Sequence, residues 1–161
     1  MIGQYHSIET FSTNDGRGIR YVLFLQGCLM QCKFCHNPDT WGKAGKEISV
    51  DQVVEQIREY VPYFKSTGGG ITISGGEPLL QADFVAEVFR RCQQEGVNTA
   101  IETSGFVSPG GLICALPYID EVFFSIKIVD EDKHKQLTGF TNRGILNNLK
   151  FIVANKGKVT I

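Results

Sequence analysis

Residues 19–38 read IRYVLFLQGCLMQCKFCHNP, in which an apolar run is followed at once by three cysteines. Residues 19–25 are rich in β-branched and aromatic side chains, and this pattern predicts a mostly buried β-strand. Cys28, Cys32 and Cys35 follow directly, in the spacing C-x3-C-x2-C. The sequence therefore predicts a site on the loop that leaves the carboxyl end of this strand.

On both sides of this stretch, short apolar runs alternate with segments of helical periodicity. Further strands are expected over residues 70–74, 97–102 and 121–126, and another begins at residues 158–161. One helix is expected from Ser49, where Ser49 and Gln52 form a capping box, to Phe64, with a kink or an end at Pro62. Two more are expected over residues 84–92, ending at Gly96, and over residues 145–153, ending near Gly157.

Repeated strand–helix units with short connections predict an α/β fold with parallel strands and right-handed crossovers. The sheet is expected to be either open and doubly wound or curved as part of a (β/α) barrel. The 161 residues form one domain, and they are too few for a closed eight-stranded barrel, which takes about 250 residues.

Composition excludes several classes of protein. Lys and Arg total 16 against 17 Asp and Glu, so the chain has no basic surplus for a nucleic acid or an anionic membrane. No apolar run approaches the roughly 18 residues of a membrane helix, and the residues after Met1 do not resemble a secretory signal. We therefore expect a cytoplasmic protein with no nucleic-acid or membrane partner.

Polar residues and glycines that do not fit a core follow the predicted strands. Since parallel strands end at the same edge of a sheet, four strand ends are expected to converge on one site. The residues at these four ends are Gly27-Cys28, Gly75-Gly76-Glu77, Glu102-Thr103 and Lys127.

The cysteine spacing favours an iron–sulfur cluster. Three thiolates on one tight loop can hold three irons of a 4Fe–4S cube and leave one iron open to a substrate. A structural Cys3His zinc site that uses His36 is the first alternative, although structural zinc usually takes two separated pairs of ligands. Unliganded thiols are the second. Cys92 and Cys114 stand alone in apolar segments and are expected to pack in the core.

At these residues the sequence resembles the radical S-adenosylmethionine (SAM) enzymes, whose loop is C-x3-C-x-aromatic-C, with Phe34 at the aromatic position. It is most similar to the branch of glycyl radical enzyme activases that includes the pyruvate formate-lyase activases. The resemblance covers essentially the whole chain. It also rests on Asp15-Gly16-Arg17-Gly18-Ile19-Arg20, Asp39-Thr40-Trp41, Gly68-Gly69-Gly70, Ser74-Gly75-Gly76-Glu77-Pro78, and His134 with Leu137-Thr138-Gly139 and Asn142.

The resemblance implies a partial (β/α) barrel and two cofactors, a 4Fe–4S cluster and SAM. In similar enzymes the three cysteines bind the cluster, residues at Phe34 and His36 contact the nucleoside, and Gly75, Gly76 and Glu77 hold the methionyl amino group. Lys127 lies near the SAM carboxylate in such enzymes, whereas His134 has no assigned role. The related activases also bind a monovalent cation through two aspartates, in Asp-Thr and Asp-x-Lys. This chain has Glu102-Thr103 and Ser125-Ile126-Lys127 instead, which leaves the cation open.

The implied activity is reductive cleavage of SAM to a 5′-deoxyadenosyl radical that takes a hydrogen atom from a backbone glycine of a partner enzyme. Pyruvate formate-lyase is the expected partner, because a ferredoxin-like cysteine-rich insert, common in other branches, is lacking in this sequence. A flavodoxin or ferredoxin-type protein is the expected reductant, and the activase is expected to be a monomer. An activase of another glycyl radical enzyme and a non-catalytic zinc or iron–sulfur module are the alternatives.

Two features differ from the activases. Arg17 stands where they usually have proline, and this exchange could alter how the partner fits. Similar activases also run on for roughly half as much again, which suits a six-stranded partial barrel. We therefore expect the 161 residues to be a radical SAM domain that stops after about four to five βα units, with a complete cluster site and an incomplete substrate site.

Overall fold

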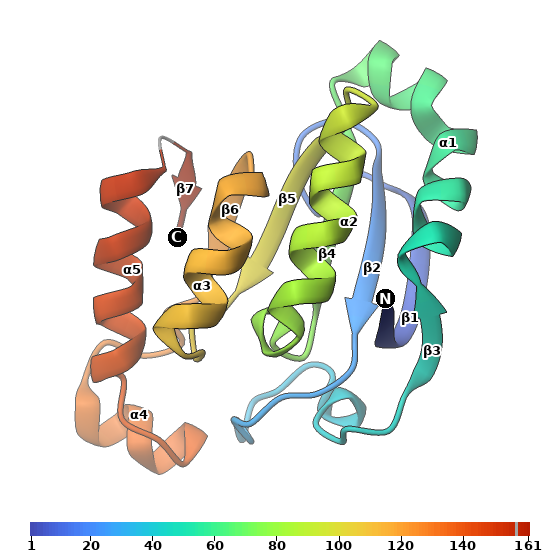
Figure 1. Cartoon of the computed structure of the whole chain (residues 1–161). Coiled ribbons are helices and arrows are strands. Elements are labelled where there is room, and N and C mark those ends of the chain that lie inside the picture. The colour runs from blue at the N-terminus through green and yellow to red at the C-terminus, as the bar shows by residue number, and fades with distance from the viewer. Residues whose placement is uncertain (157) are drawn as a thin grey trace.

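The computed structural model describes residues 1–156 and 158–161, and within them it shows one seven-stranded sheet with helices packed against it (Figure 1). The strands are β1 (Ile2–Ser12), β2 (Arg20–Leu25), β3 (Lys46–Ser49), β4 (Gly70–Gly75), β5 (Asn98–Thr103), β6 (Glu121–Phe124) and β7 (Val159–Thr160). The α-helices are α1 (Val50–Thr67), α2 (Ala82–Gln94), α3 (Pro109–Ala115), α4 (Glu131–Thr138) and α5 (Arg143–Asn155), and short 3-10 turns cover Pro38–Thr40, Pro78–Gln81 and Leu116–Tyr118.

The sheet has the order β3-β1-β2-β4-β5-β6-β7, and every pair from β2 to β7 is parallel. Helices α1, α2, α3 and α5 lie over one face of the sheet (Figure 1). A doubly wound sheet carries helices on both faces, so this arrangement favours the partial barrel of the two expected architectures. No helix in the described part of the chain is long and apolar enough to cross a membrane.

One edge of the sheet departs from the expected parallel pattern. Strand β1 pairs antiparallel with both β2 and β3. Residues 13–19, which join β1 to β2, are too few for the crossover that parallel neighbours require, so β2 returns alongside β1 as its antiparallel neighbour. The expected parallel α/β sheet is therefore confirmed, with an antiparallel edge added to it.

The strands predicted over residues 19–25, 70–74, 97–102, 121–126 and 158–161 correspond to β2, β4, β5, β6 and β7, and the three predicted helices to α1, α2 and α5. Ser49 and Gln52 form the expected capping box of α1, and α2 ends just before Gly96, which has φ 72°. The predicted end of α5 at Gly157 falls outside the described residues. Strands β1 and β3 and helices α3 and α4 were not among the predicted elements.

Pro62 was predicted to kink its helix or to end it. It does not end the helix, because α1 continues to Thr67. Proline lacks the N–H that would bond to the carbonyl of Arg58, four residues earlier. Pro62 and Arg58 are both exposed, so water can satisfy that carbonyl. The apolar stripe of α1, which includes the buried Ile57 and Phe64, then holds the last turn against the sheet.

The two faces of the sheet differ in chemistry. In β4, Ile71 and Ile73 belong to the hydrophobic core, whereas Thr72 and Ser74 alternate with them on the other face. The Thr72 hydroxyl donates to the carbonyl oxygen of Asp15 at 2.7 Å, and the Ser74 hydroxyl donates to the Glu102 carboxylate at 2.7 Å. The face away from the helices is thus polar where it approaches the cysteine loop.

Arg20, at the start of β2, is fully buried on this polar face. Its guanidinium donates to the Thr72 hydroxyl at 2.9 Å and to the Asn98 side-chain oxygen at 2.7 Å. Burial lowers its pKa to about 10, although Glu121, Asp120 and Asp15 oppose this change. Arg20 therefore joins β2, β4 and β5 through hydrogen bonds to neutral groups.

Candidate functional site

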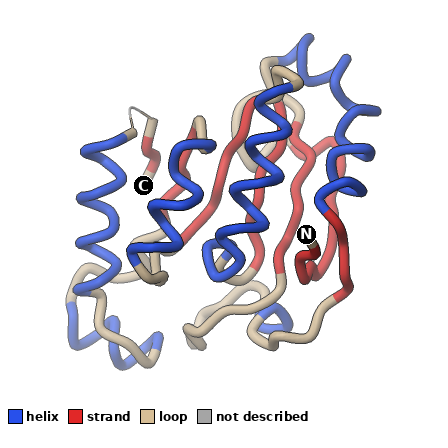
Figure 2. The backbone as a smooth tube through the Cα atoms, in the orientation of Figure 1, coloured by secondary structure: helices blue, strands red, loops and turns tan. Residues whose placement is uncertain are grey.

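The loop with three cysteines leaves β2 and lies at the carboxyl ends of the parallel strands (Figures 1 and 2). Its base is closed where the Gly27 N–H donates to the Thr40 carbonyl at 2.8 Å and the Cys28 N–H donates to the Trp41 carbonyl at 3.4 Å. At its far side, the Lys33 N–H donates to the carbonyl of Leu137 in α4 at 2.8 Å. Segments that are far apart in the sequence thus hold the loop in place.

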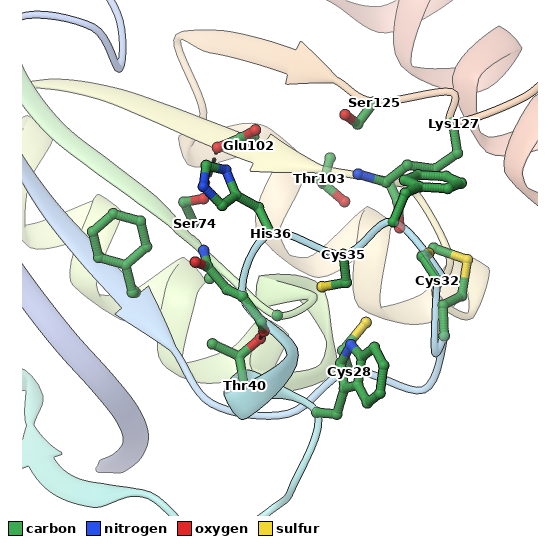
Figure 3. Close-up of a pocket in the computed structure, with 18 of the residues that line it drawn as sticks. Cys28, Cys32, Cys35, His36, Thr40, Ser74, Glu102, Thr103, Ser125 and Lys127 are labelled. Atoms are coloured by element: carbon green, nitrogen blue, oxygen red, sulfur yellow. Dashed lines mark hydrogen bonds between the residues drawn. The ribbon is translucent and has the colours of Figure 1, made fainter. Parts of the chain in front are cut away.

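A cavity of about 440 Å³ opens between this loop and the ends of β4, β5 and β6 (Figure 3). The structure therefore brings together residues from all four strand ends that the sequence placed at one site. The predicted residues that line the cavity are Cys28, Cys32, Phe34, Cys35, His36, Gly75, Gly76, Glu102, Thr103, Ser125 and Lys127. Two predicted residues, Glu77 and Ile126, are not part of its lining.

The three cysteines fit a cluster with separate iron corners. All three are free thiols on the cavity wall, and Figure 3 shows the sulfurs of Cys28 and Cys35 turned toward one another. Within residues 1–156 and 158–161, no three His, Cys, Asp or Glu side chains gather closely enough to hold a single metal ion. The thiols are thus spread along the wall, as the irons of a cube require, because each iron takes its own thiolate.

Burial affects the ionisation of these thiols. It raises the pKa of Cys28 to about 11, and it also raises the pKa of Cys32, where the nearby Lys127 ammonium opposes the rise. Since the thiolate is the metal ligand, iron must displace the protons as it binds.

Main-chain atoms of Gly75 and Gly76 form the side of the cavity at the end of β4. Gly75 has φ 112°, which L side chains rarely adopt. A Cβ atom on Gly76 would lie 2.2 Å from the Gly27 carbonyl oxygen and 3.2 Å from the Cys28 Cβ. The Gly76 N–H donates to Leu25 O at 3.0 Å. Glycine is therefore required here because the β4 end packs directly on the start of the cysteine loop.

The Glu77 side chain is not part of the cavity lining but is bonded to Thr103 and Ser104, which are, and its role toward the SAM amino group stays a prediction. Glu77 is 1% exposed, and its two oxygens accept hydrogen bonds from the Thr103 hydroxyl at 2.6 Å and the Ser104 hydroxyl at 2.6 Å. The N–H groups of Ser104 and Leu79 also donate to it, at 3.0 and 3.2 Å. Glu77 thus ties the end of β4 to the end of β5, where four donors converge on a buried acceptor.

Glu102 and Ser125 line the cavity at the two positions where similar enzymes are expected to bind a monovalent cation. The Glu102 side chain is exposed and accepts the hydrogen bond from Ser74 (Figure 3). Ser125 brings a hydroxyl where the resemblance implies a carboxylate in similar enzymes. A hard cation would find here the longer carboxylate of Glu102, already bonded to Ser74, and the hydroxyl of Ser125. This is a weaker set of oxygen ligands than two free carboxylates.

Lys127 is held at the cavity by a tight turn. The Ile128 N–H donates to the Ile126 carbonyl at 2.8 Å, and Lys127, between them, has φ 66°. Such three-residue turns are rare and strained, and strain of this kind concentrates at functional sites. In Figure 3 the Lys127 side chain extends toward Thr103. The Ile126 side chain instead packs against the core, so only its main chain can contribute to the site.

Other cavity residues were not proposed as site residues from the sequence. Asp15, Trp41, Ser74 and Ser104 line the cavity, and of these only Asp15, Trp41 and Ser74 lie in the segments that carried the resemblance. Periodicity gives no signal for Ser104, which follows the end of a strand.

The sequence left two interpretations of His134, a role in the site or a position on a helix surface. The side chain is in fact fully buried. Its Nδ1 donates to the Phe140 carbonyl at 2.7 Å, so it fixes the turn after α4.

Comparison with known protein families agrees with this geometry. Residues 22–161 match the family model of the radical SAM superfamily. The matched range contains all three cysteines and the four strand ends. The chain belongs to the radical SAM superfamily. Membership implies a 4Fe–4S cluster and SAM as cofactors, which agrees with the donor set of the cavity.

Among the relatives of this radical SAM chain are two bacterial proteins named pyruvate formate-lyase-activating enzyme. The protein from Staphylococcus epidermidis is 43% identical over 157 residues, which cover 89% of this chain and 61% of the relative. The protein from Clostridium pasteurianum is 42% identical over 153 residues, which cover 94% of this chain and 64% of the relative. The chain thus spans less than two thirds of the length of these relatives.

A solved structure supports the fold over nearly the whole chain. The crystal structure of QueE from Escherichia coli matches 99% of this chain and 93% of its own, with a TM-score of 0.56 and 17% sequence identity. At this identity the likeness concerns the fold alone.

Proposed function

We propose that residues 1–161 form a single radical SAM domain that belongs to a glycyl radical enzyme activase, with pyruvate formate-lyase as the protein substrate. The proposal rests on one observation above all: the C-x3-C-x2-C loop faces a cavity that the ends of β4, β5 and β6 complete. The names of relatives 42% and 43% identical support the activase branch.

In this proposal Cys28, Cys32 and Cys35 hold the 4Fe–4S cluster and leave one iron open. When bound and reduced, the cluster and SAM together supply a 5′-deoxyadenosyl radical that takes a hydrogen atom from a backbone glycine of the partner. The residues of this chain bind and orient the two groups. Cys32 is only 6% exposed, so the folded loop leaves water little access to this thiol.

Each wall of the cavity has its own task toward SAM. The main-chain carbonyl groups of Gly75 and Gly76 accept from the methionyl ammonium, which main chain can approach closely because no side chain intervenes. Lys127 pairs with the carboxylate of SAM. Phe34 and His36, next to the last cysteine, contact the nucleoside, and the main chain at Glu77 and Ile126 supports the two strand ends. Glu102, Thr103 and Ser125 provide hydrogen-bonding oxygens between these groups.

The proposal extends to the partners. A flavodoxin or a ferredoxin-type protein delivers the electron, and the activase works as a monomer on a larger enzyme in the cytoplasm. The five cysteines, all free, suit a reducing compartment. The match of the chain to less than two thirds of its relatives means that the glycine-binding surface has to be tested on the chain itself.

Anaerobic reconstitution with iron and sulfide tests this function. We expect a 4Fe–4S absorption band and a reduced-state spin signal that changes when SAM is added. With a reductant the chain should release 5′-deoxyadenosine, and the glycyl radical signal after addition of pyruvate formate-lyase tests whether these 161 residues also act on the partner. Stoichiometric zinc without a cluster would contradict the enzyme and favour the structural module.

Cys32→Ala is the matched test of the cluster. Because it removes one of three thiolates, we expect loss of the cluster signals and of 5′-deoxyadenosine release. Cys114→Ala, at a thiol that contacts Asp83 at 3.3 Å outside the cavity, is the control and should retain both. Retained activity in Cys32→Ala would remove this loop from the mechanism.

A further inference from the structure

The Trp41 indole has a feature that the proposed function does not use. Trp41 lines the cavity, yet its Nε1 is buried and has no hydrogen-bond partner among the described residues. An indole can only donate, and a buried donor without an acceptor costs about 1–3 kcal/mol. Such a group in a cofactor cavity indicates an acceptor that arrives with the cofactor.

Hydrogen bonds hold the main chain of Trp41 next to the cysteine loop. The Trp41 carbonyl accepts from the N–H of Cys28, the first cysteine of the loop, at 3.4 Å. The preceding carbonyl groups are also held, since Thr40 O accepts from Gly27 N–H at 2.8 Å and Asp39 O accepts from the Gln26 side chain at 2.8 Å. The Trp41 main chain is therefore anchored to that of Cys28, a residue whose thiol the proposed function assigns to the cluster.

Two kinds of acceptor are expected in this cavity, the sulfur atoms of the cluster and the carboxylate of SAM. The Lys127 ammonium and the glycine main chain assigned to SAM lie at or just after the ends of β6 and β4, whereas the Trp41 main chain is hydrogen-bonded to the cysteine loop. This placement favours the cluster as the acceptor.

We propose that the Trp41 N–H donates a hydrogen bond to a sulfur atom of the 4Fe–4S cluster and thereby raises its reduction potential. The inference rests on the proposed cluster site. Reduction adds negative charge to the cluster, so a donor aimed at its sulfur stabilises the reduced form more than the oxidised form. Trp41 is thus a positioning and tuning residue that makes the cluster easier to reduce.

The chain contains one tryptophan, which allows an isosteric test. Growth with β-(3-benzothienyl)alanine replaces only the indole N–H of Trp41 by sulfur and keeps the ring system. The matched control is 5-fluorotryptophan, which retains the N–H. The midpoint potential of the reconstituted, SAM-free chain is then measured by a redox titration, and the affinity for SAM is measured separately.

We expect the benzothienyl chain to bind the same amount of iron with a more negative midpoint potential, while the fluorotryptophan chain keeps the normal potential. An unchanged potential with weaker SAM binding would assign the N–H to SAM and overturn the proposal. Unchanged potential and unchanged SAM affinity would overturn it too. If the unsubstituted chain assembles no cluster, the proposed function itself has failed, which is a separate result.

A second measurement needs no altered side chain, in case the substituted chains fold poorly. Labelling tryptophan with nitrogen-15 gives a single indole signal. In the cluster-loaded chain we expect this signal to be shifted by the paramagnetic irons and its N–H to exchange slowly with solvent. Fast exchange of the indole proton in the loaded chain would overturn the hydrogen bond. Trp41→Phe, which also lacks the donor, should reproduce the shift to a more negative potential.

Discussion

The helix-covered face of the sheet and its carboxyl edge are built by different means. On the covered face, Ile71, Ile73 and Phe89 are fully buried apolar side chains that pack without directional bonds. At the edge, Gly76 and Glu77 fit through backbone contact and through short hydrogen bonds. Packing tolerates small changes of shape, whereas hydrogen-bonded contacts depend on single atoms. Substitutions at the edge should therefore disturb binding, and those on the covered face should disturb stability alone.

Gly76→Ala should have the largest effect on the edge. The new Cβ would lie 2.2 Å from the Gly27 carbonyl oxygen, so either the cysteine loop or β4 must move. We expect a loss of about 1–3 kcal/mol or more in unfolding free energy and several-fold less bound iron after reconstitution. Urea unfolding and iron analysis measure the two effects.

Gly110→Ala is the control for this substitution, because a Cβ on Gly110, in α3, meets no atom within 4 Å. This variant should bind iron normally and gain up to about 1 kcal/mol, since alanine favours a helix. Equal iron binding by both variants would show that the β4 end does not set the position of the cysteine loop.

Glu77→Gln should have the next largest effect. A glutamine keeps the size of the side chain but presents an NH2 group to the hydroxyl and N–H donors of Thr103 and Ser104. We expect about 1–3 kcal/mol less stability in urea unfolding, together with weaker SAM binding.

The control is Glu59→Gln at an exposed position of α1, which should change the unfolding free energy by no more than about 0.5 kcal/mol.

A double-mutant cycle that combines Glu77→Gln with Ser104→Ala tests whether Glu77 acts through the end of β5. Its losses should not add, because both changes remove the same contact. Additive losses would instead indicate that Glu77 acts independently of Ser104.

Lys127→Met should reduce SAM binding while leaving stability nearly unchanged. The side chain is exposed, so its ion pair with a carboxylate is screened by water. We expect a loss of about 1 kcal/mol, on the order of a fivefold rise in Kd, which shrinks at high salt. Lys65→Met, in the last turn of α1, is the control. Equal affinity in both variants would mean that Lys127 does not reach SAM.

The effect that is smallest near neutral pH belongs to the covered face, because it develops only above about pH 9. Burial raises the pKa of the Cys92 thiol from 9.0 to about 12. Above the unfolded pKa the unfolded chain loses this proton while the folded chain keeps it, so stability must fall as pH rises from about 9 toward 12. The fall from this one group is at most about 1.4 kcal/mol per pH unit.

Cys92→Ala should make this fall shallower in urea unfolding of the cluster-free chain, whatever its stability near neutral pH. The same slope in both chains would show that Cys92 does not carry this pH dependence. The comparison uses one group on the covered face, so the thiols of the cysteine loop remain unchanged.

Much of the fold followed from the sequence because apolar periodicity records burial. The runs that became β2 and β4 are almost wholly buried, and those of β5 and β6 are buried in part. The apolar stripes of α1, α2 and α5 likewise contain buried residues. The elements that were not predicted lack this apolar periodicity. Strand β1 is mostly half-buried or exposed, β3 has four residues, and α3 begins with Pro109-Gly110-Gly111. In α4 the buried residues are His134 and Thr138, so no apolar stripe marks it.

The candidate site was predictable where the residue type fixes the chemistry. Cysteine spacing indicated the cluster loop, and glycines at a strand end indicated close approach of main chain. The direction of a side chain is a different matter. The Glu77 carboxylate is bonded to the hydroxyls of Thr103 and Ser104 at the end of the neighbouring strand β5. Nothing in the order of residues reveals that arrangement. Likewise, the unpartnered N–H of Trp41 becomes visible only when its neighbours are in place.

The hydrogen bonds that close the cysteine loop have a consequence for its entropy. Residues 27–41 are held at the base by the bonds from Gly27 and Cys28, and at the far side by the bond from Lys33 to α4. Ordering a flexible backbone costs about 1–2 kcal/mol per residue. In this chain much of that ordering is completed when the protein folds. The incoming iron and sulfide therefore meet a preorganised cradle, and the free energy of the iron–sulfur bonds goes into affinity for the cluster.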